Sequence, residues 1–230
     1  MSNYKDFSIN IINYRSESYL EDCLASLYKS FSLGLKFEIN IINNNPASRL
    51  ENIRRLFPGV TIIETGENKG FSQGHNIGAA HALGQYLLFL NSDTRIINAD
   101  WPGIVKEFRK KETAIIGAQL RTSQGKIQDW IAGREVNIWD IILNNLGIVR
   151  SRKIWKAKEK QEVDWVSGAA MFIRRENFNQ LGGFDKKIFM YFEDIDLCYR
   201  AKKAGQKIIY LPSFVIEHLG GASFSSHVSK

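Results

Sequence analysis

The stretch "YLLFLNSDTRI", residues 86–96, decides the fold class, because a strongly apolar run ends abruptly in polar residues. An apolar run of this length is typical of a strand that is buried on both faces of a parallel sheet. The residues that follow it, Asn91, Ser92 and Asp93, are then expected at the rim of the sheet. Ligands of open α/β sheets bind at such a rim, outside the carboxyl ends of the strands.

Short apolar runs alternate with helical patterns along the rest of the chain. Strands are expected at residues 7–14, 37–45, 60–65, 86–91, 113–120 and 163–175. Helices are expected at residues 20–31, after Ser16 or Ser18 as N-cap, and at 49–57 and 101–111. This alternation predicts parallel β-α-β units with right-handed crossovers. The expected class is therefore α/β, with a mostly parallel central sheet flanked by helices.

Composition sets limits on the class of protein. The 230 residues have a net charge of +7, which favours an anionic partner or forms only a solvated face. No apolar segment reaches the roughly 18 residues that span a bilayer, and the first residues lack a signal-peptide pattern. We therefore expect a cytoplasmic protein with Cys23 and Cys198 as reduced core thiols. Nucleic-acid binding is not expected, because the basic residues are scattered and no reading motif is present.

Three segments allow a structural and a functional interpretation. Gly70, Gly74 and Gly78 permit close packing either on a helix or on a ligand. Residues 138–160 form a basic, aromatic amphipathic segment that can lie on a membrane or cover the core, and core packing is preferred. His218 ends an apolar run, where a histidine is more often structural than a metal ligand.

Three acids, Glu193, Asp194 and Asp196, lie in the first turn of a helix expected to begin at about residue 193. Acids at this place stabilise the helix dipole. The aromatic residues within 189–192 would also partly exclude water from a carboxylate and make it a better base. Both interpretations can hold, each for different members of the trio.

Five motifs, taken in order, resemble one enzyme family along nearly the whole chain. They are "NKGFSQGHNIG", "LLFLNSDT", "WVSGAAMFIRR", "GGFDKKIFMYFEDIDLCYRAKKAG" and "IEHLGGAS". Together they resemble the family 2 inverting glycosyltransferases of the GT-A fold, particularly the bacterial rhamnosyltransferase-like branch that builds surface polysaccharides. The resemblance implies a single GT-A domain over residues 1–222, with a nucleotide-sugar half (1–98) and an acceptor half (99–222), followed by a frayed tail (223–230).

The resemblance also implies a metal site and a catalytic base. Asp93 matches the carboxylate that holds a divalent metal on the donor diphosphate, with Asn91 as a neutral helper and His218 completing the site. The metal would be Mn²⁺ or Mg²⁺, since hard cations prefer oxygen ligands and imidazole tolerates Mn²⁺ better. Asp194 matches the general base, and Glu193 stands beside it in the catalytic motif.

Further residues match the donor and acceptor sites of the family. The donor-binding set is Tyr14, Arg15, Asn43, Asn68, Gly70, Asn76, Ser92 and Asp93. The acceptor-binding set is Trp165, Gly168, Ala169 and Asp196. Asn43 departs from the family pattern, which usually has aspartate at the end of the second strand.

The implied reaction transfers rhamnose or another hexose from a dTDP- or UDP-linked donor to a saccharide, which a membrane lipid would carry. The implied location is the cytoplasm, with peripheral contact at the inner face of the cell membrane. Two alternatives remain open: a nucleotidyltransferase, and a catalytically degenerate module that only binds nucleotide sugars. The oligomeric state is not predicted.

Overall fold

The computed structural model describes residues 5–134 and 151–220. The strands are β1 (Lys5–Asn13), β2 (Phe37–Asn43), β3 (Thr61–Glu64), β4 (Gly84–Asn91), β5 (Thr94–Asn98), β6 (Thr113–Arg121), β7 (Ala132–Gly133), β8 (Gln161–Val163), β9 (Trp165–Val166), β10 (Ala170–Arg174) and β11 (Lys207–His218). The helices are α1 (Glu17–Ser30), α2 (Glu51–Leu56), α3 (Gly70–His81), α4 (Trp101–Phe108), α6 (Arg152–Trp155), α7 (Arg175–Gln180) and α8 (Glu193–Lys203). The predictions for residues 138–150 and for the 223–230 tail lie outside the described residues.

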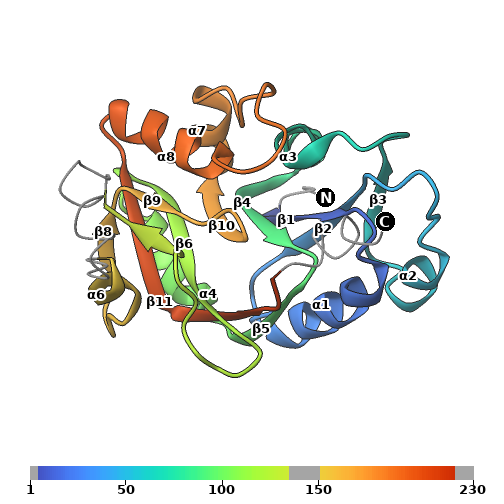
Figure 1. The fold of residues 1–230 in the computed structure, drawn as a ribbon, viewed down its shortest axis with the longest axis horizontal. Coiled ribbons are helices and arrows are strands. Elements are labelled where there is room, and N and C mark those ends of the chain that lie inside the picture. The colour runs from blue at the N-terminus through green and yellow to red at the C-terminus, as the bar shows by residue number, and fades with distance from the viewer. Residues whose placement is uncertain (1–4, 135–150, 221–230) are drawn as a thin grey trace, which may run out of the picture.

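A large sheet runs through the molecule in the order β3-β2-β1-β4-β10-β6-β11-β5, and β8 also pairs with β11. In Figure 1, α3, α7 and α8 lie along the upper side of the sheet, and α1 and α2 along its lower side. A short ribbon of β7 and β9 is separate from this sheet. The strand predicted at 86–91 is β4, where Leu87 to Leu90 are completely buried near the middle of the sheet.

The sheet is mixed rather than mostly parallel, which corrects the expectation from sequence. The strands β3, β2, β1 and β4 are parallel, as are β6 and β11, but β10 runs antiparallel to both β4 and β6. The backbone N–H of Asn91 donates to the Ala169 carbonyl at 3.0 Å, so the chain enters β10 at the rim where β4 ends. A strand that enters there can only run back along the sheet.

The last strand has an irregularity that shapes the site. β11 is one strand with a register shift between Leu211 and Val215. Pro212 lies in this irregular stretch, because proline cannot donate a ladder hydrogen bond. Beyond the shift, β11 pairs antiparallel with the unpredicted strand β5, and His218 lies opposite Thr94.

The described part of the basic aromatic segment packs into the protein. The Trp155 side chain is 2% exposed, and its indole nitrogen donates to the Ala132 carbonyl at 2.6 Å. The preferred interpretation, core packing, is thus confirmed for this tryptophan. Within residues 5–134 and 151–220, no helix has the length and apolar character required to span a membrane.

Candidate functional site

A chain of buried side-chain hydrogen bonds crosses the carboxyl ends of four parallel strands. The Ser92 hydroxyl donates to that of Ser16 at 2.7 Å, and Ser16 donates to Asn13 Oδ1 at 3.0 Å. Asn13 Nδ2 donates to Asn43 Oδ1 at 2.9 Å, and Asn43 Nδ2 donates to Glu64 at 2.7 Å. Ser16 begins α1 without capping it, since its hydroxyl serves this network instead. The network fixes the edge of the sheet at which a ligand would bind.

A cavity of about 410 Å³ opens at this edge; we call it the rim cavity. It collects residues that are far apart in the sequence but were predicted as site residues. Those that line it are Tyr14, Asn68, Gly70, Asn91, Ser92, Asp93, Gly168, Ala169, Glu193, Asp194 and His218.

Three of the residues predicted to bind the donor do not line the rim cavity. Asn43 is 1% exposed, and its amide is fully engaged in the network and with the Ser48 carbonyl. Asn76 instead pairs with both backbone groups of Phe184, at 2.9 Å each. Arg15 is exposed, with its guanidinium over the ring of Tyr14. Asn43 and Asn76 therefore support the protein segments beside the rim cavity.

Asp93 and His218 lie next to each other on the wall of the rim cavity. Asp93 is 6% exposed, and its Oδ1 lies 3.4 Å from His218 Nε2. The pairing of β5 with β11 causes this approach, because Asp93 immediately precedes Thr94, which lies opposite His218. Asn91 Nδ2 also lies 3.3 Å from His218 Nε2, so all three residues of the predicted metal site come together.

Gln128, a residue that the sequence did not indicate, orients this histidine. His218 Nδ1 lies 3.0 Å from Gln128 Oε1, and Gln128 Nε2 donates to the His218 carbonyl at 2.7 Å. A hydrogen bond from Nδ1–H to the glutamine oxygen leaves the Nε2 lone pair directed toward Asp93. Gln128 lies in an irregular loop with no periodic pattern, so no sequence signal marks it.

Asp93 and His218 would supply only two of the ligands that a divalent cation needs. Within the described residues, no group of three His, Cys, Asp or Glu side chains could hold a metal ion. One carboxylate and one imidazole at 3.4 Å nevertheless fit a hard cation that takes its remaining ligands from phosphate oxygens and water. The donor set fits Mn²⁺ in particular, because an imidazole is included.

The glycine series serves close packing. A Cβ on Gly74 would lie 2.8 Å from Ile12 Cδ1, and one on Gly78 would lie 2.7 Å from Ile42 Cδ1. Gly70 has φ +75°, and a Cβ there would meet the Phe189 carbonyl oxygen at 2.5 Å. The Phe71 amide also donates to this carbonyl at 2.8 Å. Gly70 thus holds the loop before α8 against the start of α3.

The acids at the start of α8 divide into different roles. Asp194 accepts hydrogen bonds from the Gly168 and Ile195 amides, each at 2.8 Å. Burial raises the pKa of Asp194, and these backbone donors offset part of the increase. Burial, with the neighbouring charge of Asp194, raises the pKa of Glu193 to about 7. Asp196 is held by Arg200, whose Nη2 lies 2.6 Å from its Oδ2.

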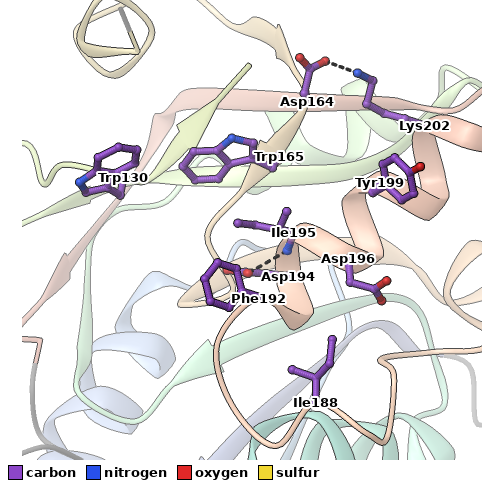
Figure 2. A pocket seen from close by; sticks show the side chains of 10 residues that line it. All are labelled: Trp130, Asp164, Trp165, Ile188, Phe192, Asp194, Ile195, Asp196, Tyr199 and Lys202. Carbon is purple, nitrogen blue, oxygen red and sulfur yellow. Dashed lines mark hydrogen bonds and ion pairs between the residues drawn. The ribbon is translucent and has the colours of Figure 1, made fainter. Parts of the chain in front are cut away.

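A second cavity of about 680 Å³ lies on the other side of these acids; we call it the aromatic cavity. Figure 2 shows Trp130 and Trp165 together at one side, with Ile195 and Tyr199 contributed by α8 and Phe192 by the residue before it. The predicted acceptor residues Trp165 and Asp196 line this cavity, whereas Gly168 and Ala169 line the rim cavity. Within the described part of the chain, Asp194 is the one residue that lines both cavities.

The chain is similar in sequence to known enzymes over most of its length. The model of the family described as "Glycosyl transferase family 2" matches residues 8–182. Rhamnosyltransferase WbbL of Escherichia coli is 28% identical, over 96% of this chain and 86% of its own length. The N-acetylglucosaminyl-diphospho-decaprenol L-rhamnosyltransferase of Mycobacterium tuberculosis is 27% identical, over 90% of this chain and 74% of its own length.

Solved structures with low sequence identity to this chain have the same fold. The crystal structure of GalNAc-T7 with UDP, GalNAc and Mn²⁺ superposes with a TM-score of 0.70 at 18% identity. This match covers 95% of the present chain and 44% of the other. The S. aureus TarS 1–349 structure gives a TM-score of 0.66 at 17% identity, over 96% of this chain and 62% of the other. The predicted α/β architecture of the GT-A type is therefore confirmed.

Proposed function

The chain belongs to glycosyl transferase family 2, and on this premise we propose that it moves a sugar from a nucleoside diphosphate to a saccharide acceptor with inversion. The position of Asp194 carries the proposal, because this carboxylate lines both the rim cavity and the aromatic cavity. A base that takes a proton from an acceptor hydroxyl must lie within hydrogen-bond reach of that hydroxyl where it meets the donor sugar. The rim cavity would hold the donor and the aromatic cavity the acceptor.

In the proposed reaction, an acceptor hydroxyl attacks the anomeric carbon of the donor sugar while Asp194 takes the hydroxyl proton. The new glycosidic bond forms as the bond to the diphosphate breaks, so the nucleoside diphosphate leaves on the opposite face. One displacement inverts the anomeric configuration. The Gly168 and Ile195 amides orient the carboxylate through one hydrogen bond to each oxygen. Its raised pKa makes it a stronger base than a solvated aspartate.

Asp93 and His218 are the residues that would hold a divalent metal, with Asn91 as a neutral neighbour. Such an ion would offset the charge that develops on the departing diphosphate. The GalNAc-T7 structure contains Mn²⁺, which supports the same choice for this chain. Gln128 would keep the imidazole directed toward the ion through its contact with Nδ1.

The donor would be a dTDP- or UDP-linked rhamnose or other hexose, bound beside Tyr14 and Asn68. The two rhamnosyltransferase relatives support the sugar, and the UDP in the GalNAc-T7 structure supports a pyrimidine nucleotide. The name of the mycobacterial relative contains an N-acetylglucosaminyl-diphospho-decaprenol, which supports a lipid-linked acceptor. Such an enzyme would work in the cytoplasm at the inner face of the cell membrane, in surface polysaccharide synthesis.

Asp194→Asn tests the proposal directly. Transfer is measured as release of nucleoside diphosphate from dTDP-rhamnose and UDP-hexoses, with Mn²⁺ and an N-acetylglucosaminyl-diphospho-polyprenol acceptor. General-base help is worth about 10²–10⁴-fold, so the variant should lose at least about a hundredfold in kcat. Donor binding, measured by the shift in melting temperature with donor and Mn²⁺, should remain.

Asp22→Asn, an exposed carboxylate on α1, is the matched control and should retain activity. Near-normal turnover of Asp194→Asn would contradict its role as the base. Donor binding without turnover in the wild-type chain, with every donor and acceptor, would instead assign the chain to the degenerate binding modules.

A further inference from the structure

More than half of the exposed large apolar side chains in the described part of the chain lie around the two cavities. Seven of its twelve exposed large apolar residues surround the mouths of the two cavities. This set, which we call the apolar rim, consists of Trp130, Phe189, Met190, Tyr191, Phe192, Ile195 and Tyr199. Phe192 is 71% exposed, and Phe189 and Trp130 are each 55% exposed. A concentration of this kind marks an interaction surface rather than scattered exposure.

The most exposed part of the apolar rim is the loop of residues 189–192, which precedes α8 and is held by a backbone contact. Tyr191 and Phe192 both have φ +69°, a conformation that side chains other than glycine seldom adopt. The loop base is fixed by the hydrogen bond from the Phe71 amide to the Phe189 carbonyl. With the backbone in this arrangement, more than half of each of the Phe189, Tyr191 and Phe192 side chains is exposed.

Basic residues border the apolar rim on two sides. Lys186 and Lys187 precede the loop and are exposed. On the other side, the rings of Trp130 and Trp155 lie 6.0 Å apart, which places α6 beside the rim. Exposed cations on and next to this helix are Arg152, Lys153 and Lys156.

The acids on the same surface are largely neutralised. Asp164 lies 2.6 Å from Lys202 Nζ, and Asp196 lies 2.6 Å from the Arg200 guanidinium. Two further acids are exposed here, Asp129 next to Trp130 and Asp185 next to the loop, where Asp185 accepts a hydrogen bond from the Lys187 amide. They are fewer than the five exposed lysines and arginines of the border. Glu193 is buried, and Asp194 lies inside the site. The border therefore presents an excess of positive charge around an apolar centre.

We propose that the apolar rim inserts into the interface of an anionic lipid bilayer, with the surrounding lysines and arginines on the lipid phosphates. Apolar and aromatic side chains ringed by basic residues have the composition of interfacial membrane-binding surfaces. A second copy of the chain fits less well, because two such basic borders would repel each other.

Membrane binding by the apolar rim is inferred without reference to catalysis. The inference rests on the proposed function only for the purpose of that binding, which is to bring a lipid-linked acceptor to the site. Trp130, Phe192, Ile195 and Tyr199 line the aromatic cavity as well as the apolar rim. A bilayer that meets the rim would thus lie at the mouth of the proposed acceptor cavity. A saccharide could then enter the cavity while its lipid chain stays in the membrane.

Vesicle binding of the full chain, without donor or acceptor, tests the inference. The expected result is co-sedimentation with vesicles of phosphatidylglycerol and phosphatidylcholine, and weaker binding to phosphatidylcholine alone or at high salt. Phe192→Ser should lower the partition coefficient about tenfold or more, because one inserted phenylalanine is lost. Leu33→Ser removes a fully exposed apolar side chain from the turn after α1 and should leave binding unchanged.

A second variant keeps the test valid should Phe192→Ser fail to fold. Lys186→Glu with Lys187→Glu changes only exposed charges and should also weaken binding to anionic vesicles. Absence of wild-type binding to these vesicles, or equal losses in Phe192→Ser and Leu33→Ser, would overturn the proposal. If light scattering gives the mass of a dimer for the wild type and of a monomer for Phe192→Ser, the surface binds a second copy of the chain instead. None of these results depends on turnover, so a failure here is distinguishable from a failure of the Asp194 assignment.

Discussion

Replacing Glu193 by glutamine should change how the stability of the protein depends on pH. Glu193 is 5% exposed, and within the described residues its Oε2 has no hydrogen-bond partner. Burial and the charge of Asp194 raise its pKa from an ordinary value of 4.5 to about 7. The carboxyl group is thus protonated in the folded protein over a pH range in which the unfolded chain has already lost the proton.

The sign of the effect follows from proton linkage. Between pH 4.5 and about 7 the folded state binds more protons at Glu193 than the unfolded state, so stability falls as pH rises. The full contribution is present below pH 4.5 and is lost as pH rises through about 7. With about 1.36 kcal/mol for each pKa unit, the loss between about pH 5 and about pH 8 amounts to 2 to 3 kcal/mol. Glutamine does not ionise, so this part of the loss disappears in the variant.

Urea unfolding of the wild-type chain and Glu193→Gln, at about pH 5 and about pH 8, measures the effect. Relative to wild type, the variant should gain about 2 to 3 kcal/mol between the two conditions. Any fixed cost of burying the amide cancels, because it is the same at both values. Glu21→Gln, an exposed residue of α1, controls for the loss of one carboxylate. A difference in unfolding free energy between wild type and Glu193→Gln that does not change with pH would show that the pKa of Glu193 is not raised in the folded protein.

Two further variants test the support of the site. Gly66→Ala should lower the free energy of unfolding by about 1 kcal/mol in urea, because alanine disfavours the left-handed backbone at this position. Gly70 has nearly the same φ, but Gly70→Ala should lower stability clearly more, because its Cβ would also meet the Phe189 carbonyl. Equal losses in the two variants would contradict this close approach. Gln128→Ala should weaken activation by Mn²⁺ about 10–100-fold in a metal titration of turnover, because the histidine loses its hydrogen-bond acceptor. Gln124→Ala in the same loop is the control, and equal Mn²⁺ affinity in both variants would argue against the role of Gln128.

Local sequence signals were sufficient for most of the strands and for the start of α8. The apolar run at 86–91 and its polar end predicted β4 and the ligand rim, because a strand buried on both faces excludes polar residues until it leaves the core. The start of α8 near residue 193 followed from its acids and its helical period. Local propensity failed for β10, whose direction depends on where the chain enters the sheet.

In the candidate site too, local motifs identified some residues, while contacts between distant segments determined how others are placed. The motifs named Asp93, Asp194 and His218, because each stands in a short pattern with chemistry of its own. They could not indicate that Asn43 is sealed beneath the rim, since its amide is consumed by partners from other strands and loops.

Residue order was enough to predict the α/β class, the ligand rim after β4 and the series of motifs that identifies the family. The folded chain was needed to show that His218, on β11, meets Asp93 through the pairing with β5, and that Gln128 orients it. It was also needed to show that Asp194 lines two cavities. Residue type and local period are properties of a short segment and can be seen without the fold. Which distant groups share one space depends on strand register and packing across the whole fold.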